Sequence, residues 1–175
     1  MITVGTNLLG FPYKQLLPVF ARDELRVGPD GLGMLAAADG VGALIATLGI
    51  AAMKQVRWKG VVYLGGAFLM GFALLLFSFS HEFLISLPLL ALLGMGMAGF
   101  QTMQSGIMLL ASPPEMRGRM MGILSVAIGC SPLGIMALGA FASLIGPLEA
   151  VRIMGVLQIL LVGGTALLAP QLRRF

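Results

Sequence analysis

Two ionisable side chains, Lys14 and Asp39, stand inside long apolar stretches of this 175-residue sequence. A charge at the centre of a bilayer costs about 3 kcal/mol unless it is paired or hydrated. Lys14 precedes the polar residue Arg22 by eight positions, and Asp39 follows Gly31 by eight. At a rise of about 1.5 Å per residue, both side chains lie roughly 12 Å below the same surface. The sequence therefore predicts an ion pair, or a shared polar cavity, between Lys14 and Asp39.

Such a pair has two interpretations. In a transport mechanism, Asp39 takes up and releases a proton, and Lys14 favours its charged form until the two helices separate. In a structural interpretation, the pair is static and fixes the register of two helices. The sequence leaves both open.

A second group of polar side chains lies in a long apolar block and comprises Gln101, Gln104 and Ser105. Positions three and four apart share one face of a helix, so Gln101 lies on the same face as the other two. Amides within a span prefer the interior of a helical bundle, where they can hydrogen-bond a substrate. The alternative is bonding between helices, worth about 0.6 kcal/mol per bond.

The connector Pro114–Arg119 brings Glu115, Arg117 and Arg119 close together in the sequence. These charges could lock one conformation through salt bridges to neighbouring helix ends. Alternatively, the two arginines only anchor the loop on the cytoplasmic side. We keep both interpretations for this candidate gating loop.

Gly129, Pro132 and Gly134 follow one another within a later apolar block. Proline frees a backbone carbonyl and can bend a helix, whereas glycine lets two helices approach closely. We expect a bend or a packing contact here.

The sequence lacks the residues and motifs that several other classes of protein require. The single cysteine, Cys130, excludes an intrachain disulfide and any multi-cysteine metal site. The sequence contains no phosphate-binding loop, no H-E-x-x-H and no G-x-S-x-G motif, so we expect no enzyme, cofactor or metal. The basic residues are scattered between apolar blocks, which argues against nucleic-acid binding.

The composition is that of a membrane protein. Hydrophobic residues make up 58% of the chain and charged residues 10%, with a mean hydropathy of +1.00, whereas soluble domains carry about 25% charged residues. A span needs about 20 apolar residues. We therefore predict one all-α, polytopic membrane domain, residues 1–175, in contact with the lipid bilayer, and six blocks meet the required length: 1–21, 31–53, 60–80, 83–111, 120–142 and 150–170.

Basic residues are distributed unequally between alternate connectors. One set of loops carries seven of them: Lys54, Arg57, Lys59, Arg117, Arg119, Arg173 and Arg174. The other set carries three: Arg22, Arg26 and Arg152. The positive-inside rule then places both termini in the cytoplasm and the chain in the cell (inner) membrane. The sequence enters its first apolar block at once, without a basic leader, so we expect a helix that once followed another segment.

Four stretches together carry a family resemblance. In chain order they are Leu16–Arg22, Gly31–Gly42, Pro114–Gly122, and Ser131–Gly134 with Gly139 and Ile145–Pro147. They resemble the C-terminal six helices of the major facilitator superfamily, and within it the bacterial efflux branch that includes the enterobactin exporter. The family's acidic and basic loop motif has a degenerate counterpart at Lys54–Gly60, which lacks the acidic partner.

The resemblance implies a fold and a function. Members pair two six-helix bundles and bind a small-molecule substrate between them, so this chain would be one half bundle that needs a second, either an N-terminal half or another copy. The implied function is proton-coupled efflux of a small amphipathic molecule. The alternative is a truncated or non-transporting membrane scaffold, or the subunit of an obligate dimer.

Overall fold

The computed structural model describes residues 2–53 and 59–168, and every regular element in that part of the chain is helical. The elements are α1 (Ile2–Leu9), α2 (Tyr13–Val19), the π-helical turn η1 (Phe20–Glu24), α3 (Pro29–Ala52), α4 (Lys59–Phe77), α5 (Phe83–Ala111), the 3-10 turn η2 (Pro114–Met116), α6 (Arg117–Gly129), α7 (Ser131–Ile145) and α8 (Pro147–Leu168). The predicted all-α membrane fold is confirmed. Most of the basic connector 54–59 lies outside the described residues.

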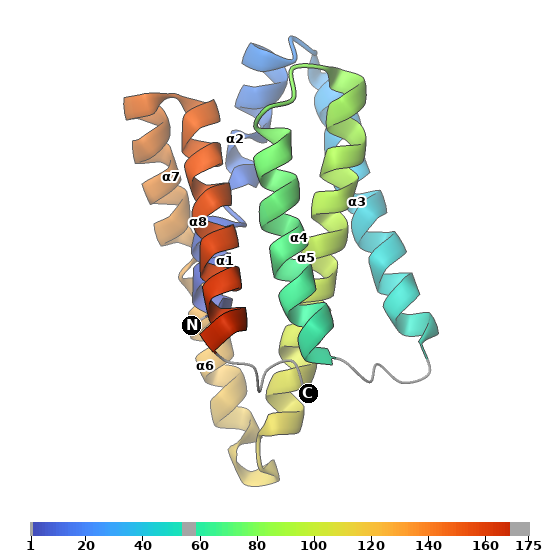
Figure 1. Cartoon of the computed structure of the whole chain (residues 1–175), viewed down its shortest axis with the longest axis vertical. Helices are drawn as coiled ribbons and strands as arrows, with labels where there is room; N and C mark the ends of the chain where they lie inside the picture. Colours follow the sequence, from blue (N-terminus) through green and yellow to red (C-terminus); the bar gives the residue numbers. More distant parts are fainter. Residues whose placement is uncertain (1, 54–58, 169–175) are drawn as a thin grey trace.

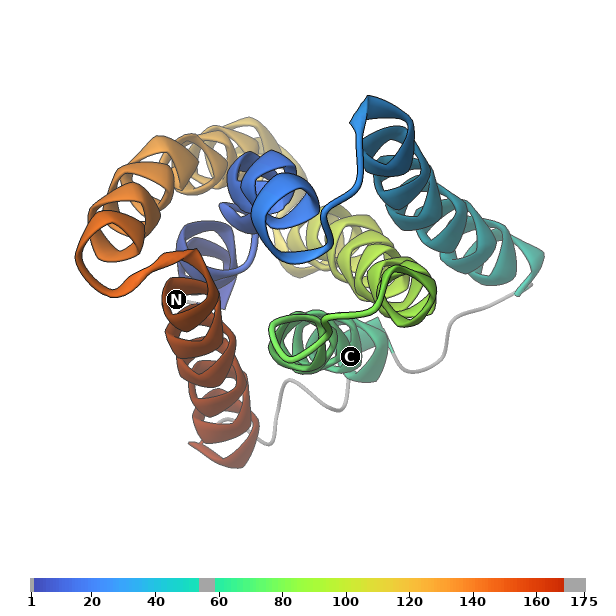
Figure 2. The same ribbon diagram turned by 90° about the horizontal axis from the view of Figure 1, so that it is seen from above.

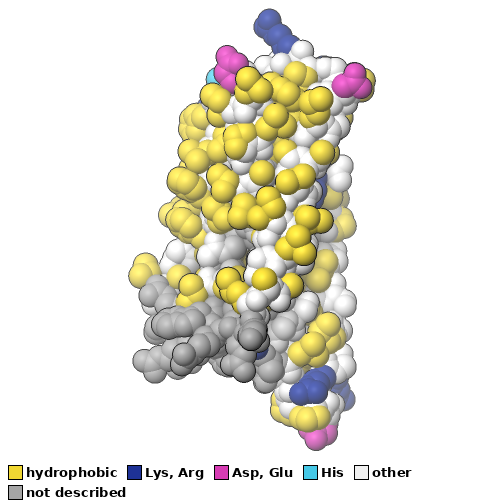
Figure 3. All heavy atoms as spheres, turned by 90° about the vertical axis from the view of Figure 1, so that its right-hand side faces the viewer, with side chains coloured by type: hydrophobic (Ala, Val, Ile, Leu, Met, Phe, Trp, Pro, Cys, Tyr) yellow, Lys and Arg dark blue, Asp and Glu magenta, His cyan; other side chains and the backbone are white. Residues whose placement is uncertain are grey.

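Within the described part of the chain, five helical stretches are long and apolar enough to cross a membrane: Pro29–Ala52, Lys59–Phe77, Phe83–Leu109, Pro114–Ile145 and Pro147–Leu168. Charged side chains gather at the two ends of the molecule, and the surface between them is largely hydrophobic (Figure 3). This belt is what a helical bundle in hydrocarbon requires.

The first predicted block, 1–21, is not one continuous helix but α1 and α2 separated by a turn. Pro12 has no backbone N–H to donate, so the hydrogen-bond ladder is interrupted where α1 ends at Leu9. The N–H of Gly10 still bonds the carbonyl of Thr6 at 2.8 Å. A second proline, Pro18, lies inside α2, which continues directly into η1.

The fifth block, expected at 120–142, is also divided. α6 ends at Gly129 and α7 begins at Ser131, with Cys130 between them, so Pro132 lies in the first turn of the new helix. Proline is well tolerated there because its missing N–H would have had no partner in that turn. Both breaks lie in the middle part of the bundle (Figure 1).

Glycines set the spacing of the central helices. A Cβ added at Gly66 of α4 or at Gly96 of α5 would lie 2.7 Å from the other residue's carbonyl oxygen. Gly71 of α4 similarly faces Gln158 of α8. α4 and α5 therefore form a tight pair, as small residues allow in membranes.

Viewed from above, α3 lies at one edge of the bundle and α6 and α7 lie at another (Figure 2). α3 packs mainly against α5, and only Leu35, Asp39 and Gly42 of this helix are buried. Since these three residues are spaced four and three apart, one narrow stripe of α3 is covered. The rest of its surface faces lipid or another protein.

Candidate functional site

The ion pair predicted within the membrane is present. Nζ of Lys14 in α2 lies 2.9 Å from Oδ2 of Asp39 in α3, and the hydroxyl of Tyr13 donates a 3.1 Å hydrogen bond to Oδ1. Asp39 is buried, whereas the Lys14 side chain is 41% exposed. Both carboxylate oxygens are thus occupied, and the lysine is the more accessible partner. The transport role of the pair stays a prediction.

Close approach of α5 buries Asp39. A Cβ at Gly94 of α5 would meet the backbone carbonyl of Asp39, and one at Gly42 of α3 would meet the backbone of Ala91. The two glycines therefore let the backbones of α3 and α5 touch at Asp39 and again about one turn further along α3. Their position around Asp39 was not anticipated from the sequence.

Tyr13 was not anticipated as a partner of Asp39. The prediction from the sequence matched opposite charges at the same depth, and a neutral hydroxyl carries no charge to match. Its position next to Lys14, at the start of a helix deep in an apolar block, is the signal that was available. A buried tyrosine hydroxyl usually finds a hydrogen-bond partner, and Asp39 was the nearest candidate in depth.

The predicted polar cluster lines a cavity of about 260 Å³. Gln101, Gln104 and Ser105 come from α5, and the other walls come from α1, the turn after α1, the end of α6 and the start of α7: Asn7, Phe11, Ile128 and Ser131. The cavity therefore lies beside both helix breaks. Such breaks are tolerated at membrane depth where the backbone is buried in protein or lines a cavity.

Lys14 and Asp39 do not line this cavity. The residues proposed together as a substrate and proton pathway thus fall into two groups, one between α2 and α3 and one between α1, α5, α6 and α7. Asn7 and Ser131 were missed because no local sequence pattern links either residue to the polar cluster of α5. The packing of α1 and α7 beside α5 brings them to the cavity.

The amide of Gln104 is the least satisfied group of the cavity. Its side chain is 7% exposed, and Nε2 is buried without a hydrogen-bond partner among the described residues. Asn7, by contrast, donates from Nδ2 to the carbonyl of Thr3 at 2.7 Å. The interhelical bond that would explain Gln104 structurally is therefore not made by its Nε2.

The candidate gating loop is open to its surroundings. Glu115, in η2, and Arg117 and Arg119, at the start of α6, are all exposed, and within the described part of the chain none of them forms an ion pair. Among residues 2–53 and 59–168, this conformation shows no salt-bridge lock at the loop. Whether another conformation forms one stays a prediction.

The glycines around the α6–α7 break differ from each other. A Cβ at Gly134 would meet the backbone of Leu8 in α1, so this glycine is a packing contact. Gly129 has open space around it. Of the two glycines that flank the break, only Gly134 therefore packs against another helix. Pro132 lies between them in the sequence.

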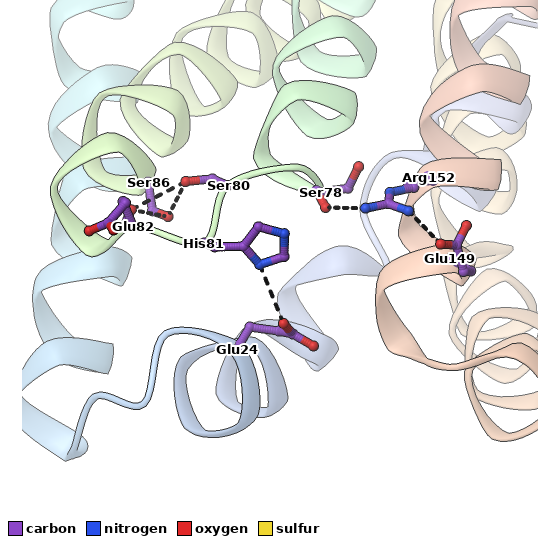
Figure 4. A network of polar contacts seen from close by, with 8 residues as sticks. All are labelled: Glu24, Ser78, Ser80, His81, Glu82, Ser86, Glu149 and Arg152. Carbon is purple, nitrogen blue, oxygen red and sulfur yellow. Dashed lines mark hydrogen bonds and ion pairs between the residues drawn. The ribbon is translucent and has the colours of Figure 1, made fainter.

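A polar network ties helices together at the end of the bundle that carries η1, the α4–α5 turn and the start of α8 (Figure 4). Nδ1 of His81 lies 3.6 Å from Oε2 of Glu24. Arg152 pairs with Glu149, donates to the carbonyl of Ser78 at 3.4 Å, and stands 4.3 Å from the centroid of the Phe79 ring. We call this end the His81 end.

An exposed ion pair between neighbouring residues, Arg22 and Asp23, lies at the same end. The guanidinium of Arg22 hydrogen-bonds the carboxylate of Asp23 with an Nε–Oδ1 distance of 2.6 Å. This hydrogen bond lowers the pKa of the Asp23 carboxyl and raises the pKa of Arg22. Both side chains are open to solvent, so the pair adds little stability.

The sequence matches a family of known proteins. The family profile described as Major Facilitator Superfamily matches residues 3–173, nearly the whole chain. No curated protein and no solved structure matches it.

Proposed function

The chain belongs to the major facilitator superfamily, a family of membrane transporters, and we propose that it forms the C-terminal six-helix half of a proton-coupled exporter of small amphipathic molecules. The observation that carries this proposal is the cavity of about 260 Å³ beside two broken helices. Broken helices at the midplane are a recurrent feature of transporter substrate sites, because they free backbone groups at that depth. Polar side chains inside an otherwise apolar bundle are costly, and where they occur they commonly mark a substrate or ion pathway.

Two helices of the bundle support the need for a second bundle. In α3 and in the stretch Pro114–Ile145, 11% and 17% of the residues in the membrane window are buried, against 56% in α4 and 44% in α5. Gly40 of α3 and Gly122 of α6 have nothing within 4 Å of an added Cβ. Uncovered small residues on both helices fit close contact with further helices, and we assign that contact to a second six-helix bundle.

Proton coupling is assigned to Asp39. Protonation of the carboxylate would remove its ionic attraction to Lys14 and leave Tyr13 to bond a neutral acid. The bond between α2 and α3 would then weaken, and these two helices could separate as one bundle rocks against the other. Efflux in the cell membrane, with both chain termini in the cytoplasm, completes the proposal.

The experiment uses the purified full chain in liposomes loaded with the pH indicator pyranine. Neutral, cationic and anionic amphipathic compounds are added under an imposed pH gradient, and proton movement is recorded. At least one compound should elicit a proton flux that Asp39→Asn abolishes and that Glu149→Gln, at the exposed His81 end, retains. Full flux in Asp39→Asn would remove Asp39 from the mechanism. No flux with any compound, from the chain alone or reconstituted together with an N-terminal six-helix bundle, would contradict the proposal.

The uncovered faces of α3 and α6 also suit a second copy of this chain, which is the competing hypothesis of an obligate dimer or scaffold. Mass photometry of the chain in nanodiscs separates the two. A stable dimer without proton flux would favour the scaffold, whereas a dimer that supports flux would make the second copy the partner bundle.

A further inference from the structure

The cavity beside the two helix breaks has the chemistry to select among ligands. On the basis of the proposed function, we infer that it binds an uncharged molecule that carries a hydrogen-bond-accepting oxygen on an apolar body. The inference starts from the lining, which combines five neutral polar residues with two apolar ones and contains no ionisable side chain: Asn7, Gln101, Gln104, Ser105 and Ser131, with Phe11 and Ile128.

The lack of a lining charge argues against an ionic ligand. A desolvated charge without a partner costs several kcal/mol in a membrane protein. Lys14 and Asp39 are bound to each other at 2.9 Å, and neither lines the cavity. A cation would find no carboxylate in the cavity and an anion no basic side chain, so a neutral ligand is favoured.

Gln104 supplies the preference for an acceptor. The residue is more than nine-tenths buried, it lines the cavity, and its Nε2 has no hydrogen-bond partner among residues 2–53 and 59–168. An orphaned buried donor costs about 1–3 kcal/mol, which an acceptor oxygen on a ligand would recover. The last side-chain bond of glutamine is soft, so a small rotation of the amide directs Nε2 to the ligand.

The start of α7 points to the same ligand chemistry. Ser131, the first residue of this 15-residue helix, lines the cavity, and no side chain caps the helix. The hydroxyl of Ser131 can donate a hydrogen bond to a carbonyl or hydroxyl oxygen of the ligand. Phe11 and Ile128 on the remaining wall offer an apolar surface for the body of the ligand.

A series of probes on one carbon frame tests this inference. Benzophenone is neutral and has one carbonyl acceptor, diphenylmethane is neutral and has none, benzhydrylamine is a cation, and diphenylacetate is an anion. Binding of each to the purified full chain in detergent is measured by equilibrium dialysis. We expect benzophenone to bind about tenfold more tightly than each of the other three, as expected for one hydrogen bond in a dry site.

Two variants localise the effect. Gln104→Leu should reduce the affinity for benzophenone to that for diphenylmethane, and Gln104→Glu should shift the preference to benzhydrylamine. Thr6→Val is the matched control, because Thr6 also buries an unpartnered hydroxyl in this chain but does not line the cavity. It should leave the order of the four probes unchanged.

Benzophenone also labels the protein when irradiated, which locates its site. Labelling should be concentrated on α1, α5 and the α6–α7 junction, and it should be lost in Gln104→Leu. Equal or tighter binding of benzhydrylamine or diphenylacetate to the unaltered chain would overturn the inference, as would unchanged benzophenone affinity in Gln104→Leu or no saturable binding. This binding order is independent of proton flux, so a chain that binds in this order but moves no protons contradicts the proposed transport and leaves the inference standing.

Discussion

At the scale of single residues, Asp39 divides its two carboxylate oxygens between partners of different kinds. Lys14 provides charge at 2.9 Å from Oδ2, and Tyr13 provides a neutral hydrogen bond to Oδ1. Removal of the lysine alone would leave a buried carboxylate with one neutral donor. Removal of both charges would leave no ion to solvate. The first change should therefore lower the free energy of unfolding, and the second should leave it close to that of the unaltered chain.

We expect Lys14→Met to destabilise the chain by about 1–3 kcal/mol. This loss is smaller than the cost of breaking a fully buried ion pair, because the lysine is partly exposed. The double variant Lys14→Met with Asp39→Asn should recover most of that loss. Thermal unfolding in detergent compares the stability of the unaltered chain, the single variant and the double variant. A double variant less stable than Lys14→Met would show that the lysine does not neutralise Asp39.

At the scale of helices, the sequence was sufficient for the positions of most elements but not for their interruptions. The long apolar blocks and the matching depth of Lys14 and Asp39 predicted the helices and their ion pair, because hydrophobic length and helical rise depend only on local sequence. The break at Gly10–Pro12 and the gathering of Asn7 and Ser131 beside Gln104 depend on how distant helices pack. No local pattern contains that information.

The contact between α3 and α5 offers a matched pair of glycines. Gly94→Ala should cost about 1–3 kcal/mol, since the new methyl group would meet the backbone of Asp39 and force the helices apart. Gly40→Ala lies on the open side of α3 and should change stability by about 0.5 kcal/mol at most. Chemical unfolding in mixed micelles gives both values. Equal effects of the two substitutions would contradict the packing described here.

At the scale of the whole molecule, the ends of the bundle differ in charge. The start of α6, which carries Arg117 and Arg119, lies at the opposite end of the bundle from the His81 end, where η1 carries Arg22 and the start of α8 carries Arg152 (Figure 1). The bias of basic residues in the sequence assigns the end where α6 begins to the cytoplasm. The direction of any transport depends on this assignment.

Single cysteines in a Cys130→Ser background test the orientation. Glu115→Cys should react with a membrane-impermeant maleimide in everted vesicles and remain protected in right-side-out vesicles. Glu149→Cys should show the reverse pattern, because it lies at the His81 end. Reaction of both cysteines from the same side would invalidate the predicted topology.

The central claim, that the cavity beside the broken helices belongs to a transport pathway, is tested most directly by accessibility of Ser105→Cys from the two faces of the membrane. The cysteine, in the Cys130→Ser background and in native membrane vesicles, is treated with an impermeant methanethiosulfonate under opposite pH gradients. We expect reaction from both faces, with rates that change in opposite directions when the gradient is reversed. Reaction from one face only, or from neither, whatever the gradient, would contradict the account.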